Sequence, residues 1–570
     1  MATQPKKRPP GDDVTQTNER MLQRLHARHE RLKAAYTDHR QAHQEIVKQF
    51  CPWRGRFFRK TRVNKPVTDE NDIYDSTGFR ALRGMGAFLM GGGSSPARKW
   101  FRLTCPDPNL AELHSVREFY SESARRMRFV LSRSNAYQAL HNIYEEISAF
   151  GTACALIERD FDDVVRMHVL TAGQYYLATD PNGDVNTVYR EFEMSVAQLI
   201  EEFGIDRMTP EVKTLAENGQ FERHFTVVHA VEPRSDRQLD KLDQLNMPWR
   251  SVYFFRGERR DVRTRGVLRE GGYKTFPYFV PRWSVADRNA WGFGPCHEAL
   301  PHAKRLQNMQ LSLSRSVAFM AEPPMQGPAS LSGKEVKLRP GAYTPVPGAG
   351  NQKIETLFDV RTDVSALAGL AQDTQEQVQR ALYNDLFLLI MNSRRAKTAT
   401  EVDEMHEEKM LMLGPALERL HNELLRPFIE RLFNFMDEAK LLPPVPSELQ
   451  TVPLQVEFVS MLQQLQQASG VVTMERFLTM IGTGAQMFPD MLDVVDPDTI
   501  ARDYAEMLAI EPDNLRDPNE VAELREARNQ ANAAMQQAEA QAVEAKTARD
   551  LAAANADSPQ LSQQFMGYEV

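Results

Sequence analysis

Residues 295–324 read PCHEALPHAKRLQNMQLSLSRSVAFMAEPP, and this stretch sets the organisation of the whole chain. Apolar side chains recur in it every three or four residues, which places them on one face of a helix. Pro323 and Pro324 then stop the helix, because proline lacks an N–H and clashes with the preceding turn. We predict one long helix over 295–322, with a stripe made of Ala299, Ala303, Leu306, Met309, Leu313, Val317 and Met320.

A second stripe of the same kind follows further along the chain. It predicts a helix over 361–391, built on Val364, Leu367, Leu370, Val378, Leu382, Leu386 and Leu389. The residues between, 323–360, are rich in Gly and Pro and include a strand candidate at 335–338. Two long helices joined by a small loop-rich module predict a stalk with a tip. Their stripes have little partner surface nearby, so we expect them to be buried against each other and against further copies of the chain in a closed ring.

Residues 71–294, which precede the stalk, are predicted to form an α+β domain. Asp75 or Ser76 can cap a helix that the glycines at 91–93 end, and a second helical stretch covers 110–150. Runs of β-branched, aromatic and apolar residues then predict strands at 153–158, 164–170, 175–178, 185–192, 225–231, 252–255 and 278–280. The fold class of the whole chain is therefore α+β, mainly helical.

The N-terminal part, residues 1–70, is predicted to be a basic arm with a helix. Its first 66 residues hold 16 Lys or Arg against 6 Asp or Glu. The Pro- and Lys-rich residues 1–13 are expected to be disordered, and a helical stripe then runs through Leu22, Leu25, His29, Leu32, Ala35 and Tyr36. Basic residues between the stripe positions could bind phosphate or an acidic partner, or form only a solvated helix face; they are Arg20, Arg24, Arg28, Arg31 and Lys33.

Three further segments follow the stalk. Residues 392–398 are polar and carry three basic side chains. Residues 399–517 begin with a long helix that a capping box starts and that runs to about Leu441, with kinks expected at Pro415 and Pro427 and a strand candidate at 454–459. Residues 518–570 hold an Ala-rich helix, in which alanines seven apart suit close helix–helix contact in an assembly, although an isolated polar helix fits equally well.

Composition excludes several classes of protein. The 570 residues carry a net charge of −8, which argues against a surface that binds nucleic acid throughout. Four cysteines lie far apart without a CxxC pair, so neither a zinc site nor a disulfide framework is expected, and a reducing compartment fits best. The sequence contains no apolar run long enough for a membrane helix, which predicts a soluble protein.

Motifs for catalysis are not found in the sequence. There is no GxSxG, no HExxH, and no complete phosphate-binding loop, since Glu335 stands where that motif needs Ser or Thr. Glu158, Asp160, Asp162 and Asp163 form an acidic cluster that could bind a cation or be a solvated turn. We therefore predict a protein that is not an enzyme, with no catalytic residues, no metal and no cofactor.

Short motifs spread along the chain, in a fixed order, carry a family resemblance. They are DSTGFRAL (75–82), SP and WF (95–101), FGTA (150–153), GQYYL (173–177) with VYR (188–190), VPRW (280–283), GFGP (292–295) with LPHAK (300–304), and TATEV (398–402) with EEK (407–409). Together they make the chain resemble the portal, or head-to-tail connector, proteins of short-tailed bacteriophages over nearly its full length.

This resemblance implies a fold and a role. The fold would be the portal fold, with 71–294 as wing, 295–322 and 361–391 as stem, 323–360 as clip, 392–398 as channel (tunnel) loop, 399–517 as kinked wing helix and wing or crown, and 518–570 as crown or barrel and tail. The chain would form a ring, usually of twelve subunits, at the capsid vertex of the virion, assembled in the host cytoplasm. Double-stranded DNA would be packaged through it by a terminase and ejected at infection. Further partners would be tail adaptor and tail proteins, the major capsid protein and scaffolding protein, with no membrane span.

The basic segment suggests how such a ring handles DNA. Phosphate affinity rises steeply with the number of cations engaged, so an acidic channel with few basic groups lets DNA move. Arg394, Arg395 and Lys397 would project into the channel; alternatively they cap neighbouring helices or pair with acidic residues of the next subunit. Rival functions are another virion protein of the tail or adaptor kind, a coiled-coil nucleic-acid scaffold using the N-terminal arm, and an enzyme with an unrecognised site.

Overall fold

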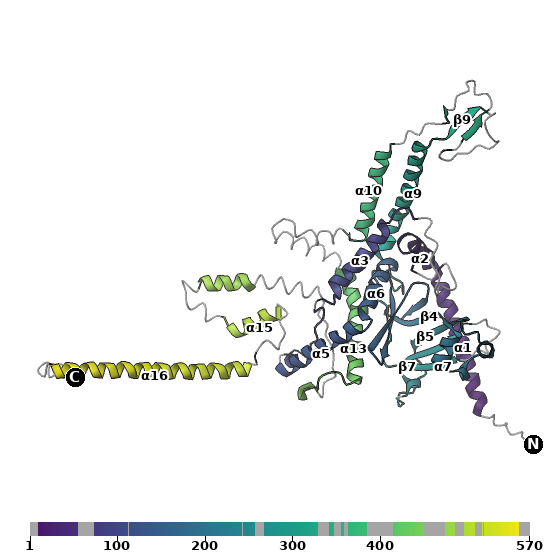
Figure 1. Cartoon of the computed structure of the whole chain (residues 1–570). Coiled ribbons are helices and arrows are strands. Elements are labelled where there is room, and N and C mark those ends of the chain that lie inside the picture. Colours follow the sequence, from purple (N-terminus) through teal and green to yellow (C-terminus); the bar gives the residue numbers. More distant parts are fainter. Residues whose placement is uncertain are drawn as a thin grey trace, which may run out of the picture. The chain divides into compact units, whose positions relative to one another are not determined.

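A computed structural model gives the fold (Figure 1). It describes residues 10–54, 57, 73–97, 99–105, 107–111, 113–241, 243–256, 267–328, 341, 343–346, 355–357, 363–384, 414–449, 474–484, 495–507, 516 and 518–557. The chain divides into two compact units. The first comprises 1–103, 123–443 and 455–463, and the second comprises 104–122, 444–454 and 464–570.

Helices of the N-terminal half enclose the core of the first unit. They are α1 (Pro10–Ala35), α2 (Thr37–Phe50), α3 (Thr77–Gly93) and α6 (Ala136–Phe150), while α5 (His114–Arg133) runs from the second unit into the first. The predicted stripe of α1 is confirmed at Leu22, Leu25, His29 and Tyr36, which are at most 2% exposed, but Ala35 is exposed. Asp75 accepts the N–H of Thr77, the first residue of α3, at 2.7 Å, whereas the N-cap residue Ser76 makes no side-chain cap hydrogen bond.

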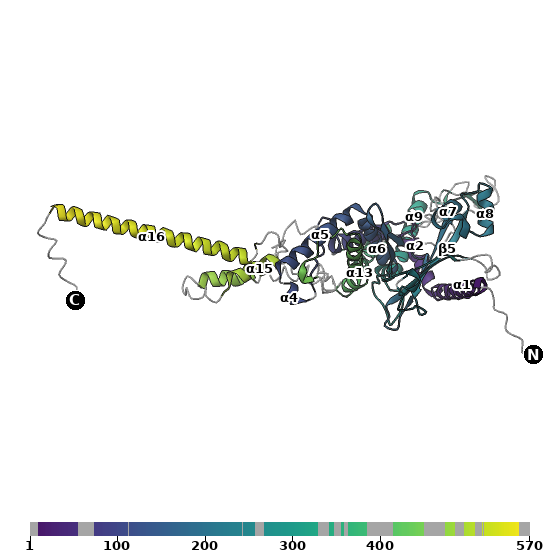
Figure 2. The same ribbon diagram turned by 90° about the horizontal axis from the view of Figure 1, so that it is seen from below.

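A five-stranded antiparallel sheet lies beside these helices, in the order β3-β4-β5-β6-β7. Its strands are β3 (Tyr175–Thr179), β4 (Val185–Ser195), β5 (His224–Pro233), β6 (Trp249–Phe255) and β7 (Val267–Tyr273). Side chains alternate between its faces, so that Val228 joins the main core while its neighbour Val227 packs against α7 (Val196–Phe203) and α8 (Pro210–Glu217). Figure 2 shows α1 and these short helices near the sheet.

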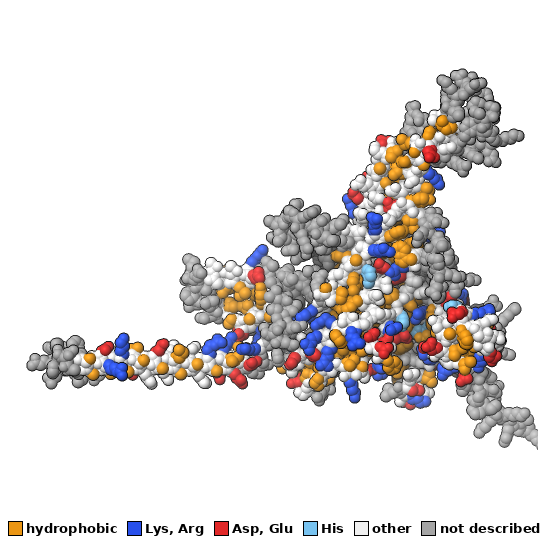
Figure 3. All heavy atoms as spheres, viewed as in Figure 1, with side chains coloured by type: hydrophobic (Ala, Val, Ile, Leu, Met, Phe, Trp, Pro, Cys, Tyr) orange, Lys and Arg blue, Asp and Glu red, His pale blue; other side chains and the backbone are white. Residues whose placement is uncertain are grey.

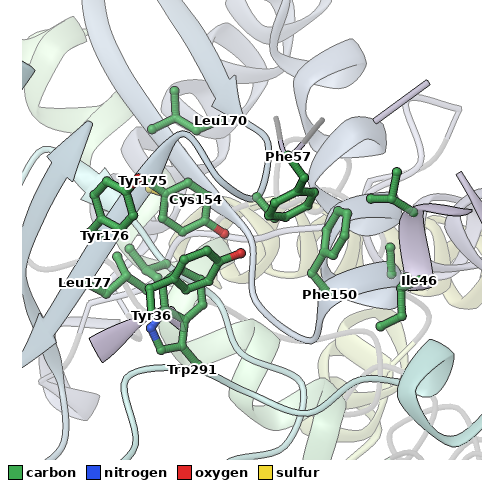
Figure 4. Packing of buried hydrophobic residues seen from close by; sticks show 14 of the residues in the cluster. Tyr36, Ile46, Phe57, Phe150, Cys154, Leu170, Tyr175, Tyr176, Leu177 and Trp291 are labelled. Carbon is green, nitrogen blue, oxygen red and sulfur yellow. The ribbon is translucent and has the colours of Figure 1, made fainter. Parts of the chain in front are cut away.

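A smaller antiparallel sheet, β2-β1-β8, joins α6 to the stalk. Its strands are β1 (Cys154–Asp160), β2 (Val164–Leu170) and β8 (Tyr278–Phe279). Aromatic rings fill the space between this sheet, α2 and the larger sheet, where Tyr36, Tyr175 and Trp291 lie close together (Figure 4). The ring centroids of Tyr36 and Trp291 are 4.5 Å apart, and those of Tyr175 and Trp291 are 5.4 Å apart.

The stalk is a pair of helices, α9 (Pro295–Ala321) and α10 (Val364–Ala381), which lie side by side (Figure 1). At their tip, β9 (Met325–Pro328) pairs in parallel with β10 (Tyr343–Val346) and antiparallel with β11 (Glu355–Thr356). The strand candidate at 335–338 lies outside the described residues.

The described chain resumes at residue 414 within a helical stretch, which contains a π-helical turn, His421–Leu425, before α13 (Arg426–Glu438). The irregularity predicted near Pro427 thus takes the form of a π turn. The capping box at 398–401 and the strand candidate at 454–459 lie outside the described residues. The second unit contains α4 (Pro108–Ala111), α15 (Pro497–Met507), a helical segment 474–484 and the predicted Ala-rich helix α16 (Pro518–Asp557).

Several local predictions were wrong. Residues 10–13 belong to α1, whereas we expected them to be disordered. The helix expected over 361–391 is interrupted after Ala381, because Leu382 and Tyr383 leave helical geometry and Tyr383 has a φ of +56°; Asn384 is helical again. The helix expected over 110–150 is broken at residues 134–135. The sequence prediction also omitted β7, α7 and α8.

Candidate functional site at the stem base

The stalk helices α9 and α10 are called the stem from here on. The region where α9 begins and α10 ends is called the stem base. At the stem base, three glycines allow the backbone at the end of α6 to contact the backbone at the start of α9 directly. A Cβ atom on Gly151 would lie 2.6 Å from the Gly292 carbonyl oxygen, and one on Gly294 would lie 2.7 Å from the Gly151 nitrogen. Gly151 also has a φ of +69° at the C-terminus of α6. Side chains at these positions would therefore push the start of α9 off α6.

A polar cluster around Asp75 ties both stem helices to the start of α3. The Gln307 side chain accepts the N–H groups of Tyr74 and Asp75 and donates to the Asp75 carbonyl. The Asp75 carboxylate accepts hydrogen bonds from Gln375 at 2.7 Å and from Gln310 at 3.3 Å. Since Gln307 and Gln310 lie on α9 and Gln375 on α10, one aspartate fixes the direction in which both helices leave the domain.

Arg282 is a second polar centre of the stem base. Its Nη2 lies 2.7 Å from Glu423 Oε1, and its Nε and backbone N–H both donate to Glu423 Oε2. Its Nη1 donates to the carbonyl oxygens of Gly183 and Asn289, each at 3.0 Å. The arginine side chain is 5% exposed and that of Glu423 18%. With these partners the buried Arg282 side chain connects three segments: the turn between β3 and β4 at Gly183, the loop before α9 at Asn289, and the π turn at Glu423.

Trp283, the residue after Arg282, contacts the chain just beyond the end of α10. The ring of Tyr383 lies 6.3 Å from the ring of Trp283, and Trp283 donates its backbone N–H to the Gly151 carbonyl. Leu382 is fully buried. A Cβ on Gly84 of α3 would lie 3.0 Å from the side-chain oxygen of Asn384. The chain thus stays against the domain up to the last described residue before 414.

Histidines and aromatic residues from α2 and α9 fill the interior next to the stem base. The Tyr36 hydroxyl lies 2.8 Å from His43 Nδ1, and the His43 and His297 rings are 5.5 Å apart. Burial lowers the pKa of His297 to about 4, and it also holds the pKa of His43 well below its usual value. The Gly294 N–H donates to His297 Nδ1, which requires a neutral ring. These imidazoles are therefore uncharged parts of the core at neutral pH.

The basic face of α1 is occupied within the chain. Arg24 and Arg28 bind the carboxylate of Glu232, which is 2% exposed, at 2.5 and 2.8 Å. Lys33 and His29 lie 3.2 and 3.0 Å from Glu191. Neither proposed role, binding to an outside partner or a solvated face, describes Arg24, Arg28 and Lys33, because they dock α1 on the strands β4 and β5. Arg20 and Arg31 are exposed, as the solvated face predicts.

The acidic cluster is a turn. Asp160 accepts the backbone N–H groups of Asp162 and Asp163 and pairs with Arg166 at 2.7 Å. Within the described ranges, no group of three or more His, Cys, Asp or Glu is placed to hold a metal ion. No helix in the described part of the chain is both long and apolar enough to cross a bilayer.

The predicted channel residues Arg394, Arg395 and Lys397 lie outside the described residues, between Asn384 and Gly414. The structure brings together other residues to which sequence reasoning gave no role, namely Arg282, Gln307, Gln375 and Glu423. Arg282 lies in one of the short motifs quoted above, and Gln307 follows another closely. Nothing in the sequence marks Glu423 as their neighbour in space.

Comparison with known proteins identifies the family. A family model described as bacteriophage head to tail connecting protein matches residues 22–515. The chain belongs to this family. It is 44% identical over 497 residues to the probable portal protein of Bordetella phage BPP-1, which covers 87% of this chain and 89% of that relative. It is 35% identical over 523 residues to the portal protein of Salmonella phage epsilon15, covering 91% and 93%.

Membership settles the function at a general level. The chain is a phage head-to-tail connector, and packaging and ejection of DNA are the general functions of such portals. It is a structural protein of the virion and not an enzyme. The family implies an oligomeric ring with capsid, tail and terminase partners.

Proposed function

We propose that twelve copies of this chain, assembled in the host cytoplasm, form the ring at the capsid vertex, in which the stem surrounds the DNA and 392–398 is the channel loop. The tip, residues 323–360, would bind terminase and later the tail adaptor. The Ala-rich helix would form the crown or barrel. The major capsid and scaffolding proteins would contact the wing. The observation that carries the proposal is the stem base, where the Asp75 cluster and the close backbone contacts of Gly151 with Gly292 and Gly294 hold both stem helices against the domain.

Exposed apolar side chains support lateral packing of the stem. In the single chain, Val317 is 46%, Met320 50% and Leu370 46% exposed, although all three belong to the predicted stripes. Figure 3 shows hydrophobic side chains gathered along the stem. Contact with the stems of neighbouring copies would bury them, and a heterologous contact of this kind gives a ring when the rotation between neighbouring copies closes. Native mass spectrometry should give a twelve-subunit species; a strictly monomeric protein at micromolar concentration would refute the ring.

Three basic side chains would act on DNA in the channel. The whole chain has a net charge of −8, so a short basic loop would give transient phosphate contacts without a continuous cationic surface. Replacing Arg394, Arg395 and Lys397 together by Ala should change packaging or DNA retention while rings still form. The matched control removes the same charges from exposed positions elsewhere, through Arg223→Ala, Arg237→Ala and Lys241→Ala.

The outcomes separate the two roles considered for these residues. If they contact DNA, the loop variant alone is defective in packaging or retention, and its rings match those of the wild type. If they instead cap helices or pair with the next subunit, the loop variant loses ring stability. Unchanged packaging and retention in the loop variant would refute the proposed contact with DNA.

A further inference from the structure

The exposed side of the stem helix α9 is basic. Arg305 and Arg315 are both exposed, and they lie on the side of the helix opposite the buried Ala303 and Leu306. The nine residues between the two arginines include no charged residue. This side of α9 therefore presents two positive charges and no negative charge between them.

The exposed side of the other stem helix, α10, carries the opposite charge. Asp373 and Glu376 are exposed, and they lie on the side of α10 that faces away from the buried Ala371, Thr374 and Val378. Since Thr374 contacts Met309 of α9, the acidic side of α10 points away from the contact between the two helices. The two charged sides therefore lie on outer surfaces of the stem.

These charges are not neutralised by strong partners inside the chain. Within the described residues, the side chains of Arg305, Arg315 and Asp373 form no hydrogen bond or ion pair. Glu376 pairs with Arg380 one turn further along at 3.3 Å, but the two side chains are 50% and 69% exposed. An exposed pair of this kind is weak, so Glu376 can still bind a second cation.

The two charged sides lie at matching levels of the stem. Thr374 Oγ1 is 3.7 Å from Met309 Sδ, which places these residues at one level of two helices that run in opposite directions. With a rise of about 1.5 Å per residue, Glu376 is roughly 3 Å from the level of Arg305, and Asp373 roughly 8 Å from that of Arg315. In stems that stand side by side, long arginine side chains and the usual tilt between packed helices cover these offsets.

We propose that the basic side of α9 in one copy binds the acidic side of α10 in the next copy, so that charge complementarity selects the contact that closes the ring. The proposal deepens the proposed function, because it rests on the ring and names the two faces that meet in it. The contact uses different faces of the two copies, as a heterologous interface does. The exposed Val317, Met320 and Leu370 lie on the same two helices and add apolar area to it.

Charge reversal tests this contact in the full-length protein. One variant carries Arg305→Glu with Arg315→Glu, and the other carries Asp373→Lys with Glu376→Lys. At about 0.1 M salt, each variant alone should give roughly tenfold fewer rings than the wild type in native mass spectrometry, because like charges then meet at every contact. Circular dichroism should show that both variants are folded.

An equimolar mixture of the two variants is the decisive measurement. In the mixture, a reversed α9 meets a reversed α10 at one contact, and a native α9 meets a native α10 at the next. Rings should therefore return to nearly the wild-type amount. They should contain the two variants in equal numbers, because only strict alternation satisfies every contact, and a ring of twelve allows it.

The matched controls reverse the same numbers of charges at exposed positions outside the stem. They are Arg223→Glu with Arg237→Glu, and Glu201→Lys with Asp240→Lys. Both should form rings as the wild type does. Normal rings in either stem variant alone would overturn the proposed contact, and so would a mixture of folded stem variants that stays without rings.

Two further outcomes separate this proposal from its rivals. If Arg305→Glu with Arg315→Glu forms normal rings but assembled heads retain less DNA, the two arginines contact DNA instead, and the proposed contact is wrong. Absence of rings from the wild type would refute the proposed ring itself, whereas the outcomes above refute only the faces assigned to it.

A neutral variant decides the matter if a reversed variant fails to fold. Wild-type rings should lose subunits as the salt concentration is raised from about 0.1 M to 1 M, because salt screens exposed charges. Rings of Arg305→Gln with Arg315→Gln should respond several-fold less to the same change. An equal response of the two proteins would overturn the contact between α9 and α10.

Discussion

Gln307 pairs with the backbone of Asp75 as a neighbouring strand would: its Oε1 accepts the Asp75 N–H at 2.9 Å, and its Nε2 donates to the Asp75 carbonyl at 2.9 Å. The two residues are separated by 232 positions in the chain. Gln307 is 6% exposed, so water cannot replace these bonds. One side chain of the stem thus completes the backbone hydrogen bonding of the segment that leads into α3.

Gln307→Leu should destabilise the first unit. Leucine is similar in size but leaves the Tyr74 and Asp75 N–H groups and the Asp75 carbonyl without their partner, so we expect the free energy of unfolding to fall by roughly 2–3 kcal/mol. Chemical denaturation followed by tryptophan fluorescence measures it. The control is Gln220→Leu, at an exposed position, which should change stability by less than about 0.5 kcal/mol. Equal stability of the two variants would contradict the role given to Gln307.

Gly294→Ala should disturb the start of α9. The added methyl would lie 2.7 Å from the Gly151 nitrogen and 2.9 Å from the Ile147 carbonyl oxygen, both backbone atoms that cannot move aside alone. We expect a loss of about 1–3 kcal/mol and fewer assembled rings, measured by thermal denaturation and size-exclusion chromatography. Gly91→Ala, whose methyl would meet nothing within 4 Å, should assemble normally. Normal rings and stability in Gly294→Ala would show that α6 and α9 can separate without cost.

Acid should weaken the interior next to the stem base. The pKa of His297 is about 4 in the folded chain against 6.5 as its ordinary value, so the unfolded chain binds more protons as pH falls through this window. The stabilisation that comes from the neutral His297 ring is fully present above about pH 6.5. The free energy of unfolding then falls by roughly 1–3 kcal/mol as the pH is lowered toward 4. His297→Gln should flatten this fall, since glutamine at the third helical position can still bond the Gly294 N–H but does not titrate.

Denaturation curves recorded from pH 7 to pH 4 test the histidine prediction. Because His43 and His39 lie nearby and also have lowered pKa values, some acid sensitivity should remain in His297→Gln. His302→Gln, on the same helix, is the control and should follow the wild type. An unchanged slope in His297→Gln would assign the acid sensitivity to other groups.

The long helices could be predicted from sequence because their apolar stripes extend over many turns, as in α9 from Ala299 to Met320. The strand β7 could not. It reads VLREGGY, with two glycines and two charges, and only Leu268 is fully buried, so its pairing with β6 comes from backbone register and not from a hydrophobic pattern. The end of α10 was missed for the opposite reason: its apolar stripe continues past Tyr383, where the positive φ interrupts the helix.

The candidate site was only partly predictable. The segments 75–82, 150–153, 280–283 and 292–295 were recognised as motifs, and they meet at the stem base. Their partners were not recognised, since pairs such as Arg282 and Glu423 are 141 residues apart and no local spacing connects them. The charge pattern of α1 was misleading for the same reason, because the acidic residues that face it lie on β4 and β5.

The basic face of α1 offers the last prediction. Arg24→Ala with Arg28→Ala would leave Glu232, 2% exposed, with only the Tyr189 hydroxyl at 2.9 Å, and a buried carboxylate without its cations is costly. We expect stability to fall by roughly 2 kcal/mol and protease to cut α1 faster, with DNA affinity unchanged. Arg20→Ala with Arg31→Ala removes the same charge from exposed positions and should leave stability unchanged. If α1 instead bound nucleic acid, both double variants would weaken DNA binding and reduce its salt dependence equally. The reason is that attraction to phosphate depends on the number of cations and not on which carboxylate they face.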